Sequence, residues 1–450
     1  MNENSRVALV YPYFRTRSPN EILFPPLGLA ALAGQLKRLG ISVKIFDCTF
    51  STLSELKDSL CRYKPSILGI YSMVTMSKSS FRIAEMTRMY LPECLLIAGG
   101  PLPTLYPDNY VGRFDAVFRG EADLGFPYFC MDYICQKVNK SGLDALPLKN
   151  YDGLFIRKNL VQIDNPLVHY GEKEINSFPL PYKNDFDHEK YQDVWFHKDG
   201  SKTASILTTL GCPFKCDFCS KPIFGNFFRR RSLDTVFDEI DQIRRLGYDS
   251  LWIADDNFTL DQDFLRRFCS RIADKSLSWS CLSRVTGLDR ETIRVMKESG
   301  CRRVYLGLET GNPATLRLMN KQASLENGIN AVHLFHEAGM ETAAFFIVGY
   351  PDETVASIEE TFSLALNLPL DFISFNVPFP LPGSKLFDRV SGIDYAKDWN
   401  SENEVTFVYN SEFDTNWLRS RIEQTVAEFT EKKNARSPAA AFVGNVISKT

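Results

Sequence analysis

The feature that most constrains the fold of this chain is a repeated alternation of short, apolar, β-branched segments with longer helix-like segments. It occurs in two series along the 450 residues, a length expected for two or three domains. In the first series the segments predicted as strands are Arg6–Tyr11, Ser42–Asp47, Ile67–Tyr71, Cys94–Ala98 and Ala116–Arg119. Strands that alternate with helices form a doubly wound parallel sheet, which binds ligands beyond the carboxyl ends of its strands. We therefore predict an N-terminal, Rossmann-like ligand-binding domain over residues 1–140.

The second series begins near Ser205 and predicts six further strands. They are Ile206–Thr209, Ser250–Ala254, Trp279–Leu282, Arg303–Leu308, Glu341–Val348 and Phe372–Val377. Six βα units are too few for a closed eight-stranded barrel, but they still place the strand ends around one mouth. We predict a partial (β/α)6 barrel of the TIM type over residues 201–385, so the fold class is α/β.

Two segments outside these series are less regular. Residues 141–200 are predicted as a linker, with a possible hairpin between Asp152 and Pro166. Residues 386–450 are predicted as a small helical C-terminal domain, because Asn416–Lys433 has an amphipathic pattern. We expect this domain to cover the mouth of the barrel and to help select the substrate.

Three cysteines follow the first strand of the second series: Cys212, Cys216 and Cys219. Closely spaced thiolates suit a soft metal centre, and an iron–sulfur cubane held by only three cysteines leaves one iron for a non-protein ligand. A structural zinc site would normally add a fourth ligand, and no second Cys-x-x-Cys pair follows. Zinc and a chance grouping of loop cysteines therefore stay as alternatives to an iron–sulfur cluster.

Charge and cysteine usage restrict the partners and the compartment. A net charge of −3 and a pI of about 6.1 argue against nucleic-acid binding, and the compact basic run at 229–231 is interpreted as a loop before a helix. Neither a secretory signal nor a membrane-spanning stretch is recognisable. Eleven cysteines, an odd number, fit reduced thiols, so we expect a cytoplasmic protein without a membrane partner. His169, His188 and His197 lack metal-ligand spacing and are predicted as surface residues.

The spacing Cys-x3-Cys-x2-Cys, with Phe218 just before the last thiol, resembles the radical S-adenosylmethionine (SAM) enzymes. The resemblance implies that Cys212, Cys216 and Cys219 hold a [4Fe–4S] cluster. It also implies that the free iron chelates the amino and carboxylate groups of SAM, and that Phe218 packs near the adenine. A partial barrel with the cluster loop after its first strand is the fold this family implies.

Residues at the later strand ends extend this resemblance. Matched by position, the implied SAM contacts are Asp255, Asp256, Arg284, Glu309, Ile347 and Gly349. The two aspartates stand where many relatives have Gly-Gly-Glu, Arg284 would meet the SAM carboxylate, and 347–349 would pack on adenine. Each acidic residue taken singly could instead be a helix N-cap or an ordinary loop charge.

The strand ends of the first series also collect unusual residues. They are Pro26 and Gly28, Ser72 and Thr75, Gly99, Gly100 and Pro101, and Gly120 and Glu121. Any one of them could be an ordinary βα turn. Together, Pro-Pro-x-Gly, Gly-Gly-Pro-x-x-Thr and Arg-Gly-Glu resemble the cobalamin-binding domain that precedes the cluster domain in one radical SAM branch. The chain lacks Asp-x-His-x-x-Gly, which would offer a lower cobalt ligand, and has Leu102 where relatives often carry histidine.

The two resemblances imply a cobalamin-dependent radical SAM methyltransferase. In that branch a 5′-deoxyadenosyl radical abstracts hydrogen from an unactivated carbon, which then takes methyl from methylcobalamin. The cofactors carry this chemistry, so no side-chain general base is singled out. The implied partners are a small-molecule, peptide or protein substrate and an electron donor such as flavodoxin or ferredoxin. The alternatives are an enzyme of the same architecture that cyclises, dehydrates or rearranges its substrate, and a regulator that senses cobalamin or redox state.

Overall fold

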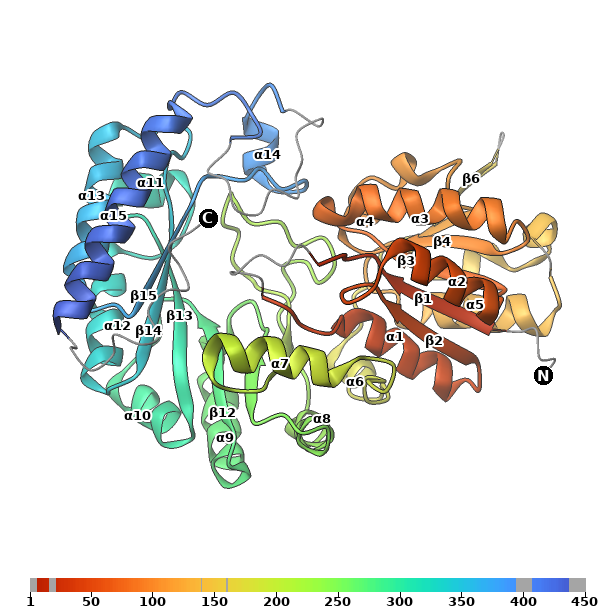
Figure 1. The fold of residues 1–450 in the computed structure, drawn as a ribbon, viewed down its shortest axis with the longest axis horizontal. Coiled ribbons are helices and arrows are strands. Elements are labelled where there is room, and N and C mark those ends of the chain that lie inside the picture. The colour runs from red at the N-terminus through yellow and green to blue at the C-terminus, as the bar shows by residue number, and fades with distance from the viewer. Residues whose placement is uncertain (1–5, 16–21, 139, 159–160, 394–406, 437–450) are drawn as a thin grey trace. The chain divides into compact units, whose positions relative to one another are not determined.

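Two parallel sheets, one in each of two units, organise the chain in the computed structural model (Figure 1). The structure describes residues 6–15, 22–138, 140–158, 161–393 and 407–436. Unit 1 comprises Met1–Arg17, Leu23–Tyr191 and Lys221–Gln242, and unit 2 comprises the rest of the chain. The division between the units falls within α7 (His188–Asp199) and α8 (Leu233–Arg245), and each unit is a separate compact body.

The sheet of unit 1 has the order β2-β1-β3-β4-β5-β6-β7. Its parallel strands are β1 (Arg6–Tyr11), β2 (Ser42–Asp47), β3 (Ile67–Tyr71), β4 (Leu95–Gly99) and β5 (Ala116–Phe118). Its helices are α1 (Leu27–Arg38), α2 (Leu53–Tyr63), α3 (Ser77–Tyr90), α4 (Pro101–Leu105) and α5 (Gly125–Cys135). The strand order reverses between β1 and β3, and this is where doubly wound folds bind ligands. The predicted Rossmann-like domain is therefore confirmed.

Alternation along β1 explains why helices cover both faces of this sheet. Val7 and Leu9 point into one apolar core, and Ala8 and Val10 point into the other. All four side chains are at most 1% exposed. A strand buried on both faces is typical of parallel sheets, whose crossover helices pack on either side.

The segment expected as a linker is largely packed onto unit 1. The predicted hairpin is present as β6 (Leu154–Lys158) and β7 (Val161–Asp164), which extend the sheet in antiparallel fashion. Beyond it, Tyr182 N donates to Ala30 O of α1 at 2.9 Å. A Cβ atom on Gly34 would lie 2.7 Å from Leu180 O, so the chain passes too close to α1 for a side chain at that position.

The sheet of unit 2 has six parallel strands in the order β15-β14-β13-β12-β11-β8. The strands are β8 (Thr203–Ile206), β11 (Ser250–Ile253), β12 (Ser278–Ser283), β13 (Cys301–Glu309), β14 (Glu341–Ile347) and β15 (Phe372–Asn376). The helices that follow the strands are α9 (Gln262–Ile272), α10 (Arg290–Glu298), α11 (Pro313–Leu318), α12 (Leu325–Glu337) and α13 (Val355–Asn367). The open six-stranded partial barrel is confirmed.

The C-terminal segment contributes to the wall of unit 2. Its long helix α15 (Thr415–Arg436) lies beside α13, and Arg421 Nε donates to Glu359 Oε1 at 2.8 Å (Figure 1). The short helix α14 (Lys385–Arg389) follows the last strand. At the end of β14, a Cβ on Gly349 would lie 2.9 Å from Phe407. The segment therefore reaches one strand end at the mouth, whereas its main helix packs on the outer layer.

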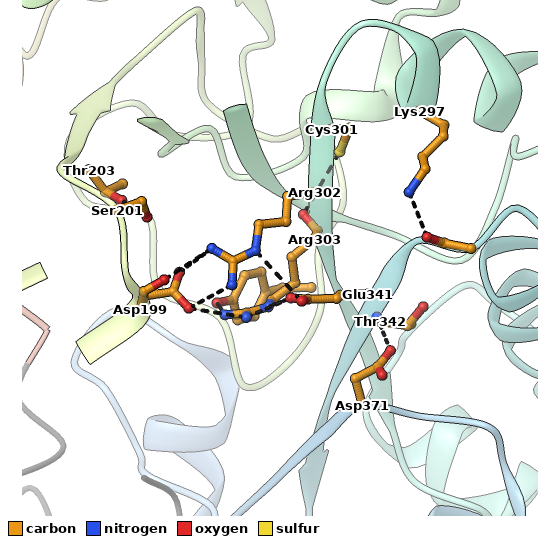
Figure 2. Close-up of polar contacts among 12 residues, drawn as sticks. Asp199, Ser201, Thr203, Lys297, Cys301, Arg302, Arg303, Glu341, Thr342 and Asp371 are labelled. Atoms are coloured by element: carbon orange, nitrogen blue, oxygen red, sulfur yellow. Dashed lines mark hydrogen bonds and ion pairs between the residues drawn. The ribbon is translucent and has the colours of Figure 1, made fainter. Parts of the chain in front are cut away.

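A network of ion pairs joins the amino-terminal ends of β13 and β14 (Figure 2). Arg303 Nη2 lies 2.6 Å from Glu341 Oε2 and 3.3 Å from Asp199 Oδ1. Arg302 Nη2 lies 3.2 Å from the same Asp199 oxygen. The amino-terminal end of the strands in such a barrel usually contributes to stability, so we interpret this network as structural.

Among the residues that the structure describes, we find no helix with both the length and the apolar character needed to cross a membrane. The longest described helix, α15, carries charged residues throughout its sequence.

Candidate functional site

The three cysteines lie on a loop that unit 2 holds at several backbone points. Asp217 N donates to Met319 O at 3.0 Å, and Leu386 N donates to Asp217 O at 2.8 Å. Within the loop, Cys219 N donates to Cys216 O at 3.1 Å. These contacts attach the loop to segments after β13 and β15. The protein itself therefore fixes the backbone conformation of the loop.

The thiols fit an iron–sulfur cluster by their chemistry and accessibility. Cys212 and Cys216 are partly exposed and Cys219 is exposed. All eleven cysteines lie in described residues, and none is in a disulfide. No group of three or more described His, Cys, Asp or Glu residues is arranged around one metal ion. A cubane needs a different arrangement, because each thiolate binds its own iron.

Arg284, directly after β12, reaches the middle cysteine. Its Nη1 donates to Cys216 Sγ at 3.4 Å, and its guanidinium lies 3.8 Å from the ring centroid of Phe214. Its Nη2 also donates to Lys321 O. Arg284 is 6% exposed, and its Nε is a buried donor without a hydrogen-bond partner. A cation beside a thiol stabilises the thiolate, and an unpaired buried donor suits a polar ligand.

A buried ion pair lies at the end of β13. Glu309 accepts a short hydrogen bond from Lys321 Nζ, and the two residues are 6% and 5% exposed. Glu309 has a φ of +67°, which is rare for a residue with a side chain. Lys321 is a site residue that no motif identified. The only signal for it is that a buried carboxylate needs a cationic partner.

The structure brings Phe218 and Ile347 together, as the resemblance implied. Both pack against a small apolar cluster formed by Met319, Tyr350 and Leu386. Lys321 Nζ lies 5.8 Å from the ring centroid of Phe218. An apolar surface beside charged groups matches a ligand with a flat base and a polar amino-acid end.

The two aspartates after β11 occupy different environments. Asp255 is fully buried and accepts hydrogen bonds from Thr208 N at 2.6 Å, Thr208 Oγ1 at 2.5 Å and Thr209 Oγ1 at 2.8 Å. Burial raises the pKa of Asp255 to about 6, although these hydrogen bonds oppose the change. Asp256 is exposed. Asp255 thus supports the strand that leads into the cysteine loop, and Asp256 is the more accessible carboxylate.

The loop after β14 is closed around a carboxylate. Glu353 Oε2 accepts from Gly349 N at 2.9 Å and Tyr350 N at 3.0 Å. Burial raises the pKa of Glu353 to about 7 against the effect of these donors. Gly349 has a φ of +80° and is covered by Phe407, so the packing leaves no room for a side chain there. The hydroxyl of Tyr350 is buried without a hydrogen-bond partner.

The residues predicted to bind cobalamin gather at the carboxyl edge of the sheet in unit 1. Gly100 has a φ of +107°, and a Cβ on it would lie 2.6 Å from Ser72 O. Thr104 Oγ1 accepts from Gly120 N at 2.9 Å, which joins the ends of β4 and β5. Ser72 Oγ is 2.7 Å from Tyr110 Oη and is fully buried.

The remaining predicted residues lie near the same edge. Gly99 ends β4, Pro101 begins α4, Thr75 is in a short turn after β3, Pro26 caps α1 and Gly28 is in the first turn of α1. Among the described residues, no atom outside the neighbouring backbone of α1 lies within 4 Å of a Cβ placed on Gly28, so this position is accessible to a ligand. At position 100, by contrast, only glycine fits, because the backbone that follows β3 passes too close for a side chain.

Aromatic rings that the motifs did not identify stand at the point where the strand order reverses. The ring centroids of Tyr11 and Tyr71 are 5.7 Å apart, and those of Tyr11 and Tyr13 are 6.2 Å apart. Burial raises the pKa of Tyr71 to about 12. Flat, partly buried rings at the carboxyl edge of the sheet fit a large planar cofactor such as a corrin.

Glu121, like Ser72, is a predicted cobalamin contact whose side chain is enclosed by protein groups. It is 3% exposed and is bonded to Arg229, His169 and the backbone of Tyr170. Its contacts indicate that it orients neighbouring side chains. His169 is predicted as a surface residue because it lacks metal-ligand spacing, but it is half-buried, and its carboxylate partner lies 48 residues away in the sequence.

Comparison with known families gives two matches. The radical SAM superfamily model matches residues 206–365, and the B12 binding domain model matches residues 21–129. The chain thus combines a B12-binding domain with a radical SAM domain.

Individual relatives resemble most of the chain. An uncharacterized methyltransferase of Pyrococcus horikoshii is 29% identical over 380 residues, which cover 81% of this chain and 78% of the relative. The anaerobic magnesium-protoporphyrin IX monomethyl ester cyclase of Rubrivivax gelatinosus is 25% identical over 444 residues, covering 95% and 78%. The solved structure of the radical SAM methyltransferase TsrM from Kitasatospora setae, with cobalamin and a [4Fe–4S] cluster bound, has a TM-score of 0.71 at 17% identity, covering 86% and 78%. At that identity the structural match shows a shared fold.

The two matched domains lie in the same order as in the fold described above, with the B12-binding domain before the radical SAM domain. The radical SAM domain implies a [4Fe–4S] cluster and SAM, and the B12-binding domain implies cobalamin.

Proposed function

We propose that this protein is a cobalamin-dependent radical SAM methyltransferase that methylates an unactivated carbon. The observation that carries the proposal is the presence, in one chain, of a three-thiol loop contacted by Arg284 and a B12-binding domain with an open carboxyl edge. When bound, the cluster with SAM would supply a carbon-centred radical, and cobalamin would supply the methyl group.

In this proposal the side chains of unit 2 hold and orient SAM. Cys212, Cys216 and Cys219 would be the cluster ligands, and Arg284 would orient the Cys216 sulfur through its hydrogen bond. Arg284 Nε is a buried donor available to the SAM carboxylate, and Glu309, which is paired with Lys321, would contact the SAM ammonium group with its remaining acceptor capacity.

Apolar side chains of unit 2 would complete the SAM site. Phe218 and Ile347 form part of one apolar cluster, which would pack against the adenine. Asp255 holds the strand before the loop, and exposed Asp256 can reach a bound ligand.

In unit 1, the glycines at the ends of β4 and β5 and the tyrosines at the ends of β1 and β3 would surround the corrin. We further propose a low-potential flavodoxin or ferredoxin as the electron donor, because reductive SAM cleavage needs one electron. A reducing, cytoplasmic location is supported by eleven cysteines without a disulfide.

The test is to reconstitute the cluster, add cobalamin, SAM, reductant and candidate substrates, and analyse the nucleoside products. Methylation predicts both 5′-deoxyadenosine and S-adenosylhomocysteine. With turned-over substrate, deoxyadenosine as the sole nucleoside product would contradict methyl transfer.

The similarity to a magnesium-protoporphyrin IX monomethyl ester cyclase favours a second candidate, a non-methylating radical reaction. It predicts deoxyadenosine without S-adenosylhomocysteine, together with a product that gains no methyl mass. A regulator would form neither nucleoside, so the same measurement separates the three functions.

A further inference from the structure

A buried carboxylate at the end of β5 holds one imidazole through a single ring nitrogen. His169 Nδ1 lies 2.9 Å from Glu121 Oε1. Arg229 forms a bidentate ion pair with the same carboxylate: its Nη2 lies 2.7 Å from Glu121 Oε1, and its Nη1 lies 2.8 Å from Glu121 Oε2. The side chains of Glu121 and Arg229 are only 2% and 8% exposed, so this pair forms a rigid base for the ring.

These contacts determine which nitrogen of His169 carries its proton. A carboxylate paired with a guanidinium is ionised, and an ionised carboxylate only accepts hydrogen bonds. In the neutral ring the proton is therefore on Nδ1, and Nε2 presents its lone pair. Among the described residues, Nε2 has no hydrogen-bond partner.

The surroundings keep this second nitrogen accessible. Gly225 has a φ of +61°, and a Cβ on it would lie 3.3 Å from both Nε2 and Cε1 of His169, so any side chain there would crowd the nitrogen. The ring rests against Phe227 at a centroid distance of 4.9 Å. The His169 side chain is 26% exposed. A small molecule can therefore approach Nε2.

The ring also lies at the ligand-binding edge of the sheet. A Cβ on Gly120 would lie 3.2 Å from Leu167, so the segment 167–169 runs over the carboxyl end of β5. Gly120 is bonded to Thr104 of the Gly-Gly-Pro-x-x-Thr motif. His169 thus belongs to the edge that carries the other predicted cobalamin residues.

We propose that His169 Nε2 is an axial ligand of the cobalt of bound cobalamin, with Glu121 and Arg229 as positioning residues. The inference rests on the cofactor of the proposed function. Metal-binding histidines characteristically donate their other N–H to a carboxylate, which fixes the ring and raises its basicity. Imidazole nitrogen is also a suitable donor for first-row transition metals.

Another histidine of unit 1 is different. His188 Nε2 lies 2.8 Å from Lys183 O, so that nitrogen is already used within the fold. The chain has no Asp-x-His-x-x-Gly after β1, and His169, held at the end of β5, would replace the histidine that this motif supplies.

The test is electron paramagnetic resonance of the Co(II) form of cobalamin bound to uniformly ¹⁵N-labelled protein. Coordination by His169 predicts a doublet splitting from ¹⁵N, in place of the triplet given by unlabelled protein. A triplet in both samples would show that the cofactor's own dimethylbenzimidazole is the ligand. Absence of nitrogen splitting would show that no axial nitrogen is coordinated. Either of these results would overturn the inference.

Variants assign the signal to one residue. His169→Gln should abolish the doublet, and the matched control His197→Gln, an exposed residue bonded only to Asp193 O, should keep it. A doublet that persists in His169→Gln would also overturn the inference. The nucleoside assay on the same samples reports the proposed function separately: methyl transfer without a doublet rejects only the cobalt ligand, and wild-type protein that binds no cobalamin rejects both.

Discussion

The two ends of the six-stranded sheet in unit 2 both carry arginines, but they use them differently. At the amino-terminal end, Arg302 and Arg303 form ion pairs with Asp199 and Glu341, so each of these charged groups has a partner of opposite charge within the protein (Figure 2). At the carboxyl-terminal end, Arg284 contacts a thiol and backbone carbonyls and keeps one buried donor without a partner. The first arrangement supports the strands, and the second leaves binding capacity for a ligand.

The largest effect is expected from removing the central thiol of the loop. Cys216→Ala should abolish SAM cleavage, because the cubane would retain only two protein ligands. Iron content and 5′-deoxyadenosine formation measure this loss. The control is Cys135→Ala, an exposed cysteine on α5, which should retain both. Retained cleavage in Cys216→Ala would refute the cluster assignment.

Arg284→Lys tests the binding role of the carboxyl-terminal arginine. A lysine keeps the charge but loses the planar donor group that spans Cys216 and the Lys321 carbonyl. We expect deoxyadenosine formation to fall by about 10–100-fold, as for other residues that orient metal ligands. Arg302→Lys, at the opposite end and 37% exposed, is the control and should leave the rate unchanged. Equal losses in the two variants would contradict the difference between the ends.

Glu353→Gln tests whether a buried carboxylate at the carboxyl-terminal end of the sheet makes the stability of the protein depend on pH. Burial raises the pKa of Glu353 to about 7 from the ordinary 4.5, so between these pH values the folded protein retains a proton that the unfolded chain has lost. The contribution of Glu353 to the free energy of unfolding therefore falls as pH rises from 4.5 to 7. Glutamine does not titrate and can accept the same two N–H groups.

The stability of Glu353→Gln relative to wild type should consequently rise across this window, by an amount on the order of 2 kcal/mol. Urea denaturation at pH 5 and pH 8 measures the change. A difference between the two proteins that is the same at both pH values would show that Glu353 titrates normally.

The smallest effect is expected at the amino-terminal end. Arg303→Met removes one of the two arginines paired with Glu341 and the cation that lies 4.1 Å from the Phe372 ring, and should lower the free energy of unfolding by about 1–2 kcal/mol. The loss is moderate because Glu341 is 36% exposed and stays hydrated. Arg294→Met, which removes an exposed arginine from its ion pairs with Glu291 and Glu298 on one helix, should lower the free energy of unfolding by less than Arg303→Met does.

In neither variant should SAM cleavage per bound cluster change. A selective loss of cleavage in Arg303→Met would show that the amino-terminal end also acts in catalysis.

Short-range patterns in the sequence were sufficient to predict both sheets, the three-thiol loop and the glycines at the strand ends. Each of these patterns, such as strand periodicity, Cys-x3-Cys-x2-Cys or Gly-Gly-Pro-x-x-Thr, spans only a few consecutive residues. They can therefore be recognised without knowledge of the tertiary structure. The same locality explains why the packing of segment 165–190 on α1 was not predicted: Leu180 approaches Gly34 across almost 150 residues.

The sequence by itself therefore determined the class of each domain and the kind of metal centre. Only the tertiary structure decided the partners of the charged side chains: Lys321 for Glu309, Cys216 for Arg284, and Glu121 for both Arg229 and His169. The physical reason is that periodicity records which face of an element is buried. The partner of a buried charge depends on which distant segments folding brings within hydrogen-bond distance.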